Sequence, residues 1–172
     1  NMSRGPYASL NMRWGARMGD TKMIDMVVGA LHDPFHTIHM GVTAENVAAK
    51  YGITREMQDA LAVESHNRAQ RATAAGYFKD QIVPVTLKSK KGEVAWATDE
   101  HFRPDCKLED MAKLKPVFIK ENGTVTAGNA SGICDGAASL VLADAAWAAA
   151  RGLTPIARLV GWGVAGCDPS IM

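Results

Sequence analysis

The apolar residues in the first third of the chain recur at helical spacing. After Thr21, the side chains that fall on one helical face are Met23, Met26, Val27, Ala30 and Leu31. This pattern predicts a short amphipathic helix that ends at Pro34, because proline inside a helix removes a backbone hydrogen bond. A second helix is predicted from Thr43, as its N-cap, to Gly52. Residues 1–20 show no period and predict an extended loop.

The clearest predicted helix lies between Thr54 and Gly76. Thr54 suits an N-cap, Glu56 favours the positive end of the helix dipole, and Gly76 is a typical stop. The predicted buried face carries Met57, Leu61, Ala69 and Ala72. The charged residues beside that face are Arg55, Asp59, Arg68 and Arg71. The pattern therefore predicts an apolar side turned inward, with the charges beside it.

Beyond residue 80 the period changes to that of strands. Runs at 82–87 and 94–97 flank a Lys-Lys-Gly turn and predict a β-hairpin, followed by a short helix near 108–114. Further strands are expected at 117–119, 124–127, 138–143 and 156–164, of which 138–143 is expected to be buried by its composition. An alanine-rich helix is expected from Asp144 to Gly152. Strand, helix and strand in that order predict a layered α/β core in the last third of the chain. The first two thirds are predicted to be mostly helical, with a hairpin.

Composition narrows the possible functions. The 172 residues are 47% hydrophobic and carry a net charge of +1, which argues against nucleic acid as the main partner. The sequence has no apolar run of the roughly 18 residues that cross a bilayer, so no membrane role is expected. Three cysteines without CxxC spacing favour a reducing compartment, and a cytoplasmic location is expected. The residues at both ends suggest a fragment of a longer protein.

The histidines and cysteines are candidates for metal binding and for nucleophilic chemistry. The spacing of His32, His36 and His39 could place them on one helical face as zinc ligands. Pro34 breaks that helix, which favours loop or surface histidines and no metal. The cysteines are Cys106, Cys134 and Cys167. The acidic residue adjoining the first two would raise a thiol pKa, and structural roles are expected for all three.

The small residues from 128 to 136 match neither GxGxxG nor a P-loop. They do allow a ligand to approach the backbone closely, with Ser131 available as a hydrogen-bonding hydroxyl.

Several segments in order along the chain resemble the thiolases. They are 39–48 (HMGVTAENVA), 76–78 (GYF), 82–85 (IVPV), 111–116 (MAKLKP) and 122–135 (NGTVTAGNASGICD), with support from 17–20 and 165–169. The similarity is greatest to bacterial biosynthetic acetoacetyl-CoA or 3-ketoacyl-CoA thiolases. It implies a thiolase-like α/β layered fold, with a mostly helical loop domain at 1–132, the end of the first α/β half at 133–154, and the start of the second at 155–172.

The resemblance implies an acyltransferase that condenses two acyl-CoA molecules, typically two acetyl-CoA, or cleaves 3-ketoacyl-CoA. The family's nucleophilic cysteine lies upstream of this segment and its His and Cys bases downstream, so no catalytic residue is expected here. Coenzyme A thioester is the substrate, no other cofactor is implied, and a homotetramer is expected to form through the loop near Trp14–Met18. Reaction direction and chain-length preference stay open.

The same resemblance implies a wall that contacts coenzyme A. The residues assigned to it are Leu31, His39, Met40, Arg103, Ala127, Ser131 and Ile133. The alternative for each is local: core packing, a loop hydrogen bond or a cap. Two departures concern this region. Asp110 stands where the family commonly has Ser, and Cys134 where it has Asn. Two other functions stay open: a non-catalytic acyl-CoA or lipid-carrier binding relative, and a purely structural assembly module.

Overall fold

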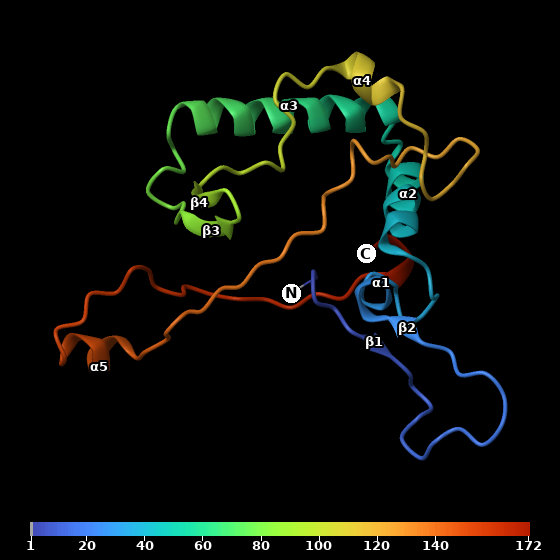
Figure 1. Cartoon of the computed structure of the whole chain (residues 1–172), viewed down its shortest axis with the longest axis horizontal. Helices are drawn as coiled ribbons and strands as arrows, with labels where there is room; N and C mark the ends of the chain where they lie inside the picture. The colour runs from blue at the N-terminus through green and yellow to red at the C-terminus, as the bar shows by residue number, and fades with distance from the viewer. Residues whose placement is uncertain (1) are drawn as a thin grey trace.

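Two consecutive helices form the frame of the computed structural model, which describes residues 2–172 and so leaves Asn1 of the expected N-terminal loop outside. They are α2 (Met40–Tyr51) and α3 (Arg55–Ala74). The chain bends between them at Gly52, whose positive φ of 64° suits glycine. Figure 1 shows α3 lying across one end of the molecule and α2 descending from it toward the N-terminal region.

The N-terminal region is a small antiparallel unit joined to a short helix. Strand β1 (Tyr7–Ala8) pairs with β2 (Ile24–Asp25), and α1 (Met26–Ala30) follows directly. The predicted helix therefore starts later than its apolar spacing indicates, because the Asp25 carboxylate accepts the Val27 amide at 2.9 Å and caps it. The long loop between β1 and β2 leaves Trp14 and Met18 almost fully exposed.

Helix α2 begins three residues before its predicted cap. His39 is the N-cap, and its Nδ1 accepts the Gly41 amide at 3.0 Å. Thr43, the predicted cap, lies buried inside the helix, and its hydroxyl donates to the Met40 carbonyl at 2.7 Å. Helix α3 matches its prediction: Thr54 accepts the Met57 amide at 3.3 Å, and the helix ends just before Gly76.

The predicted inward face of α3 is wrong in the first half of the helix and holds in the second. Ala69 and Ala72 are partly buried and Arg68 and Arg71 are exposed, as predicted. Asp59 is only 5% exposed, whereas Met57 and Leu61 are 61% and 68% exposed. The reason is that the side of α3 bearing Asp59 packs against α4 (Leu108–Ala112) and the segment 124–129, whose backbone groups need polar partners. Local periodicity could not predict those partners.

The hairpin forms close to its predicted place. Strand β3 (Val85–Ser89) pairs antiparallel with β4 (Gly92–Trp96), with Val85 opposite Trp96 and Leu87 opposite Val94. The strands predicted at 117–119 and 124–127 are reduced to one bridge between Pro116 and Thr126. In that segment the side chain of Glu45 accepts the Thr124 and Val125 amides, in place of a neighbouring strand.

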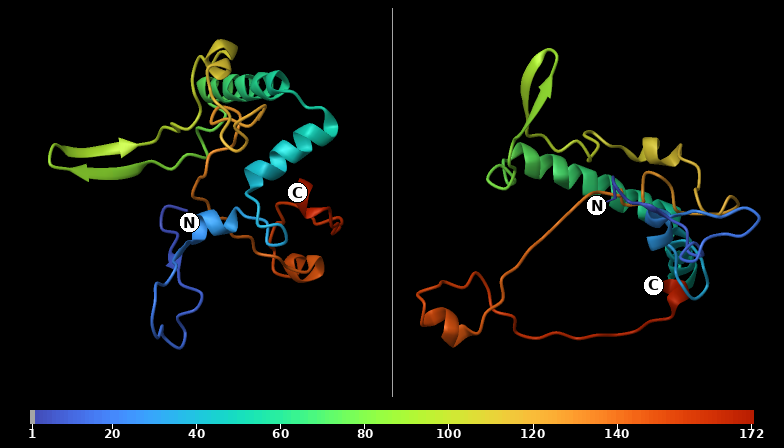
Figure 2. Two further views of the ribbon diagram at one scale, coloured as in Figure 1. Left: turned by 90° about the vertical axis from the view of Figure 1, so that its right-hand side faces the viewer. Right: turned by 60° about the horizontal axis from the view of Figure 1, so that its bottom comes forward.

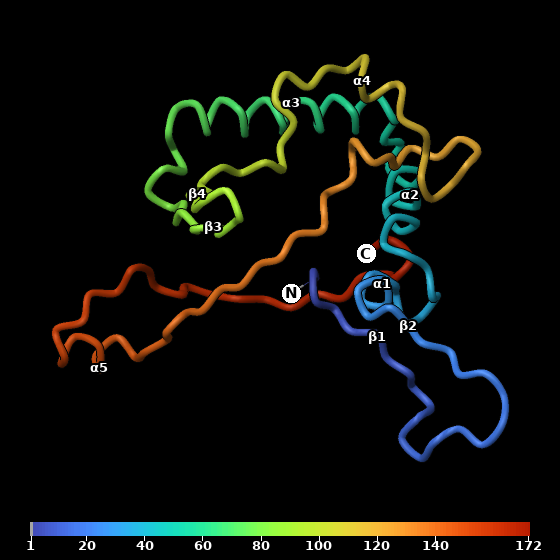
Figure 3. Tube along the Cα trace, viewed as in Figure 1, coloured from blue at the N-terminus to red at the C-terminus, as the bar shows by residue number. Residues whose placement is uncertain are grey.

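The last third extends away from the helices. Helix α5 (Ala145–Ala149), capped by Asp144 as predicted, lies at the far end of a wide excursion (Figures 1 and 2). The excursion returns to α2, where Asn46 donates to the carbonyl of Ser170 in the 3-10 helix η1 (Pro169–Ile171) at 2.8 Å. The tube in Figure 3 follows the same path from α5 back to η1.

The strands predicted at 138–143 and 156–164 are absent from this part of the described chain. Val141 is 96% exposed, so the predicted burial is wrong here too. A strand needs a neighbour to accept and donate its backbone hydrogen bonds, and no strand within residues 2–172 pairs with these segments. Among the described helices, none combines the length and apolar character needed to cross a membrane.

Candidate functional site

A cavity lies between α3, α4 and two connecting segments. Its volume is about 590 Å³. Its walls include His66 from α3, Arg103 from the loop before α4, Asp110 and Met111 from α4, and Ala127 and Gly128 from the segment that follows. The cavity is open to solvent and mixes charged, apolar and glycine surfaces, so it can receive a ligand that has both polar and apolar parts.

The loop that carries Arg103 is tied to α3. His66 Nδ1 accepts the Arg103 amide at 3.1 Å. The Gln70 amide group closes a pair with Asp105, accepting its backbone N–H at 2.9 Å and donating to its carboxylate at 3.2 Å. Asp105 has a positive φ of 56°, a conformation for which aspartate is enriched. These contacts fix the backbone of Arg103 at the cavity rim.

Two ionisable groups in this cavity have displaced pKa values. The hydrogen bond and the positive charge of Lys113, at 2.9 Å, lower the pKa of Asp110. Burial raises the pKa of the Cys106 thiol, and the neighbouring Asp110 carboxylate adds to this effect. Asp110 is therefore an ionised but paired group, and Cys106 remains a protonated thiol, which is a poor nucleophile.

Buried carboxylates hold the segment that forms the opposite wall. Glu45 of α2 accepts the Thr124 amide at 2.9 Å, the Val125 amide at 2.8 Å and the Thr124 hydroxyl at 2.7 Å. Burial acts to raise the pKa of Glu45, but these hydrogen bonds outweigh it and hold the pKa below its ordinary value. Glu45 thus acts as an ionised anchor for the start of this wall.

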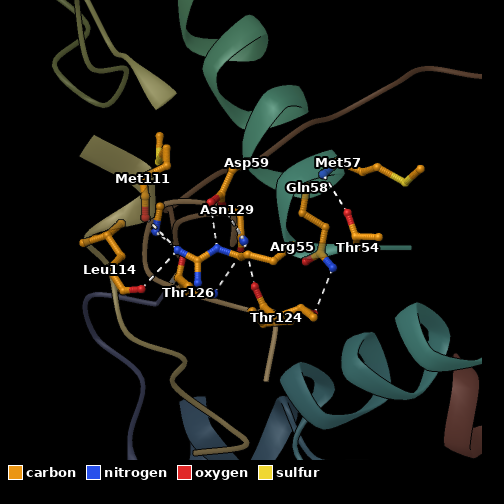
Figure 4. Close-up of polar contacts among 12 residues, drawn as sticks. Thr54, Arg55, Met57, Gln58, Asp59, Met111, Leu114, Thr124, Thr126 and Asn129 are labelled. Carbon is orange, nitrogen blue, oxygen red and sulfur yellow. Dashed lines mark hydrogen bonds and ion pairs between the residues drawn. The ribbon is translucent and has the colours of Figure 1, made fainter. Parts of the chain in front are cut away.

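A second anchor comes from α3 (Figure 4). Asp59 accepts Arg55 Nε at 2.7 Å and Asn129 Nδ2 at 3.0 Å. Asn129 in turn closes its own turn, donating to the Thr124 carbonyl at 2.9 Å and accepting the Thr126 amide at 2.7 Å. The turn that presents Ala127 and Gly128 is consequently fixed by side chains rather than by a sheet.

A separate cluster surrounds His39. Its ring stacks on Phe118 with centroids 4.7 Å apart and meets the His32 ring edge-on at 5.2 Å. Burial lowers the pKa of His39, and the charge of His32 lowers it further. Because Nδ1 accepts the Gly41 amide, the neutral ring carries its proton on Nε2, where it can donate to a ligand.

The structure divides the predicted wall residues into groups. Arg103 and Ala127 line the cavity, and Ser131 lies between Ala130 and Gly132, which line it too. Leu31 and Met40 adjoin His39, with the Met40 amide donating to the Leu31 carbonyl at 2.8 Å. Ile133 is largely exposed beyond Gly132. Their contact with a ligand stays a prediction.

The histidine and cysteine alternatives can also be placed. His32 Nδ1 lies 2.7 Å from the Val28 carbonyl, and no cluster of three or more metal-ligating side chains occurs within residues 2–172. Cys134 Sγ lies 4.0 Å from His101 Nδ1. Cys134 and Cys167 are exposed, free thiols.

The residues that hold the cavity walls in place were not predicted from the sequence: Glu45, His66, Gln70 and Asn129. Asp59, which has the same role, was predicted only as one of the charged residues beside the buried face of α3. Glu45 and Asn129 stand inside the recognisable segments 39–48 and 122–135. No local pattern distinguishes Asp59 from the exposed charges of α3.

The family model described as "Thiolase, N-terminal domain" matches residues 1–146. The chain is 62% identical over its whole length to beta-ketothiolase BktB of Cupriavidus necator, and it spans 44% of that protein.

Two solved structures match the fold. The acetyl-CoA acetyltransferase of Bacillus anthracis has a TM-score of 0.85 at 51% identity, covering 99% of this chain and 43% of that one. The human mitochondrial 3-ketoacyl-CoA thiolase in complex with CoA has a TM-score of 0.82 at 44% identity, covering 99% and 42%. The excursion from residue 133 onward is thus part of a fold shared with both proteins, since each alignment covers nearly all of the chain.

Proposed function

Because the chain belongs to the thiolase family, we propose that the full-length protein carrying it transfers acyl groups between coenzyme A thioesters. The reaction is the condensation of two acyl-CoA molecules, typically two acetyl-CoA to acetoacetyl-CoA, or the reverse thiolysis of 3-ketoacyl-CoA. The observation that carries the proposal is the 62% identity to a beta-ketothiolase over all 172 residues. The chain spans 44% of that relative's length, so this activity is proposed for the whole protein.

In this proposal the chain supplies binding and orientation. The cavity at Arg103 receives the nucleotide end of coenzyme A, where a guanidinium can pair with phosphate. The backbone at Ala127 and Ser131 supports the extended pantetheine, with the Ser131 hydroxyl as a hydrogen-bonding group. Asp110 lines this cavity, and its ion pair with Lys113 offsets the repulsion that a carboxylate would otherwise exert on phosphates.

The cluster around His39 serves the other end of the substrate. The neutral ring donates from Nε2 to a carbonyl or amide of the bound thioester. Leu31 and Met40 adjoin it and form an apolar surface for the pantetheine and the acyl chain, whereas Ile133 continues the wall that carries Ala127 and Ser131. None of these groups attacks the thioester, and the acyl-enzyme step belongs to a cysteine expected upstream of this segment.

The proposal extends to domains and assembly. Residues 1–132 form the loop domain, 133–154 complete the first α/β half and 155–172 begin the second. From residue 131 onward the side chains are almost all exposed, which supports the boundary near residue 133. We also propose that a homotetramer assembles through the β1–β2 loop. The near-complete exposure of the large apolar side chains of Trp14 and Met18 supports this proposal.

The test is an assay of the full-length protein. Acetyl-CoA is supplied, and free CoA and acetoacetyl-CoA are followed in wild type and in a variant with the upstream cysteine changed to alanine. We expect turnover in wild type and its loss in the variant. A protein that binds CoA without turnover would contradict the proposal and favour a non-catalytic acyl-CoA-binding relative. One with neither activity nor CoA affinity would favour a structural module.

A further inference from the structure

One ion pair on α3 connects to both sides of the cavity. Arg55 Nε lies 2.7 Å from Asp59 Oδ2, and the two side chains are only 20% and 7% exposed. An ion pair between residues one helical turn apart on an exposed surface contributes little to the stability of the protein. This pair is shielded from water, and each partner makes further hydrogen bonds to a segment distant in sequence, so its geometry can be transmitted to those segments.

Asp59 reaches the wall that carries Ala127 and Gly128. Its second oxygen accepts Asn129 Nδ2 at 3.0 Å, and the same Asn129 side chain closes the turn around residues 124–129. Thr126 Oγ1 also accepts the Gly128 amide at 3.2 Å. Through Asn129, the position of the Asp59 carboxylate therefore sets the position of this turn.

Arg55 reaches the facing wall. Its Nη2 donates to the Met111 carbonyl at 2.6 Å and to the Leu114 carbonyl at 3.0 Å (Figure 4). Met111 and Leu114 both line the cavity. The planar guanidinium holds Asp59 and these carbonyls at once, which a lysine ammonium on a flexible stem does not reproduce.

The two walls meet at Gly128. A Cβ added there would lie 2.4 Å from Met111 Sδ and 2.5 Å from Leu114 Cδ1. At this point the two walls are so close that no side chain larger than that of glycine fits between them. A small shift of either wall therefore changes the width of the cavity. The residues that fix both walls are Arg55 and Asp59, and neither of them lines the cavity.

We infer that Arg55 and Asp59 are positioning residues that set the separation of the cavity walls 111–114 and 127–128, and through it the affinity for coenzyme A. The inference rests on the proposed function, since it takes coenzyme A as the ligand of this cavity. It assigns the pair no contact with substrate, so the chemical step at saturation is independent of it.

The experiment uses the full-length protein and measures the CoA dissociation constant by calorimetry, together with KM and kcat. Asp59→Asn keeps an oxygen toward Asn129 but can place an amide N–H against Arg55 Nε. We expect the CoA dissociation constant and KM to rise about tenfold, because small displacements of binding groups are costly, with kcat changed less than about twofold. Arg55→Lys releases the carbonyls of Met111 and Leu114, and we expect it to raise the CoA dissociation constant and KM as well.

Glu64→Gln is the matched control. Glu64 forms an i,i+4 pair with Arg68 at 2.8 Å on the same helix, but its side chain is 42% exposed and lies outside the cavity. A wild-type CoA dissociation constant in Asp59→Asn, with only a lower melting temperature, would overturn the inference. If that variant does not fold, a wild-type constant in Arg55→Lys overturns it. A wild type that binds CoA without turnover, while both variants bind it more weakly, contradicts the proposed function alone.

Discussion

Glu45 is a buried carboxylate whose hydrogen bonds fix the segment 124–126, which has only one isolated β-bridge to the rest of the described chain. It is 5% exposed, and it accepts the Thr124 and Val125 amides and the Thr124 hydroxyl. Glu45→Gln should lower the free energy of unfolding by about 2 kcal/mol, because a neutral amide is a weaker acceptor and turns an N–H toward these donors. Urea unfolding of the full-length protein at neutral pH measures the difference.

The pH dependence of Glu45 provides a second test at the residue scale. Its pKa in the folded protein lies below the ordinary value of 4.5. Its stabilising effect is therefore complete above the unfolded-state pKa and is lost as pH falls through the folded-state pKa. The difference in unfolding free energy between wild type and Glu45→Gln should stay constant from neutral pH to about 5 and shrink below it. A difference that grows on acidification would contradict this role.

Gly41 permits the close approach of α2 to Phe118. A Cβ at Gly41 would lie 2.0 Å from Phe118 Cε2. Gly41→Ala should destabilise the protein by about 1–3 kcal/mol, since the displaced ring outweighs the gain in helix propensity. In Gly29→Ala, by contrast, the new Cβ would meet only Ile24 Cγ2 at 3.5 Å. Gly29→Ala is the control, and its melting temperature should equal or slightly exceed that of wild type. An equal loss of stability in both variants would refute the role of the contact between Gly41 and Phe118.

At the scale of elements, α3 depends on its cap as well as its packing. Thr54 accepts the Met57 amide at 3.3 Å at the start of the helix. Thr54→Ala should cost about 1 kcal/mol of unfolding free energy, and Thr54→Ser should recover most of it, because serine offers the same acceptor. Thermal melting of the two variants decides the point. A serine variant as unstable as the alanine one would assign the loss to the methyl group instead.

The helices were predictable because their signals are local. The cap at Thr54, the stop at Gly52 and the cap at Asp144 all depend on residues within one or two turns. The inward face of the first half of α3 was not predictable, since Asp59 is buried by partners some 70 residues away, including Asn129. The cap of α2 was missed because His39 uses a ring nitrogen, whereas the preferred cap residues use a side-chain oxygen.

The candidate site shows the same limit. The wall residues came from a resemblance of sequence segments. The residues that hold the walls are identified by the structure and not by the sequence pattern. They are Arg55, Asp59 and Asn129. Hydrogen bonds between side chains distant in sequence leave no period to detect, so this part of the site could not be inferred from the pattern.

At the scale of the whole molecule, the chain has two contrasting parts. Up to residue 132, helices and buried polar contacts enclose a cavity, and the buried apolar residues include Ala48, Met111 and Val125. Beyond it, apolar residues such as Val141 and Val160 are exposed in extended backbone. The strand prediction there used residue type alone, and residue type does not supply the neighbouring strand that pairing requires.

Coenzyme A binding in the cavity between Arg103 and Ala127 underlies both the proposed function and the positioning role of Arg55 and Asp59. The most direct test is calorimetric titration of CoA into the full-length wild type and Ala127→Trp, with Lys91→Trp at the exposed hairpin turn as the control for an added indole. We predict that Ala127→Trp weakens CoA binding about tenfold or more, which is about 1.4 kcal/mol, because the indole would occupy space that the ligand needs. Lys91→Trp should bind as wild type does. Equal affinity in Ala127→Trp and wild type, or no binding by wild type, would show that this cavity is not a coenzyme A site.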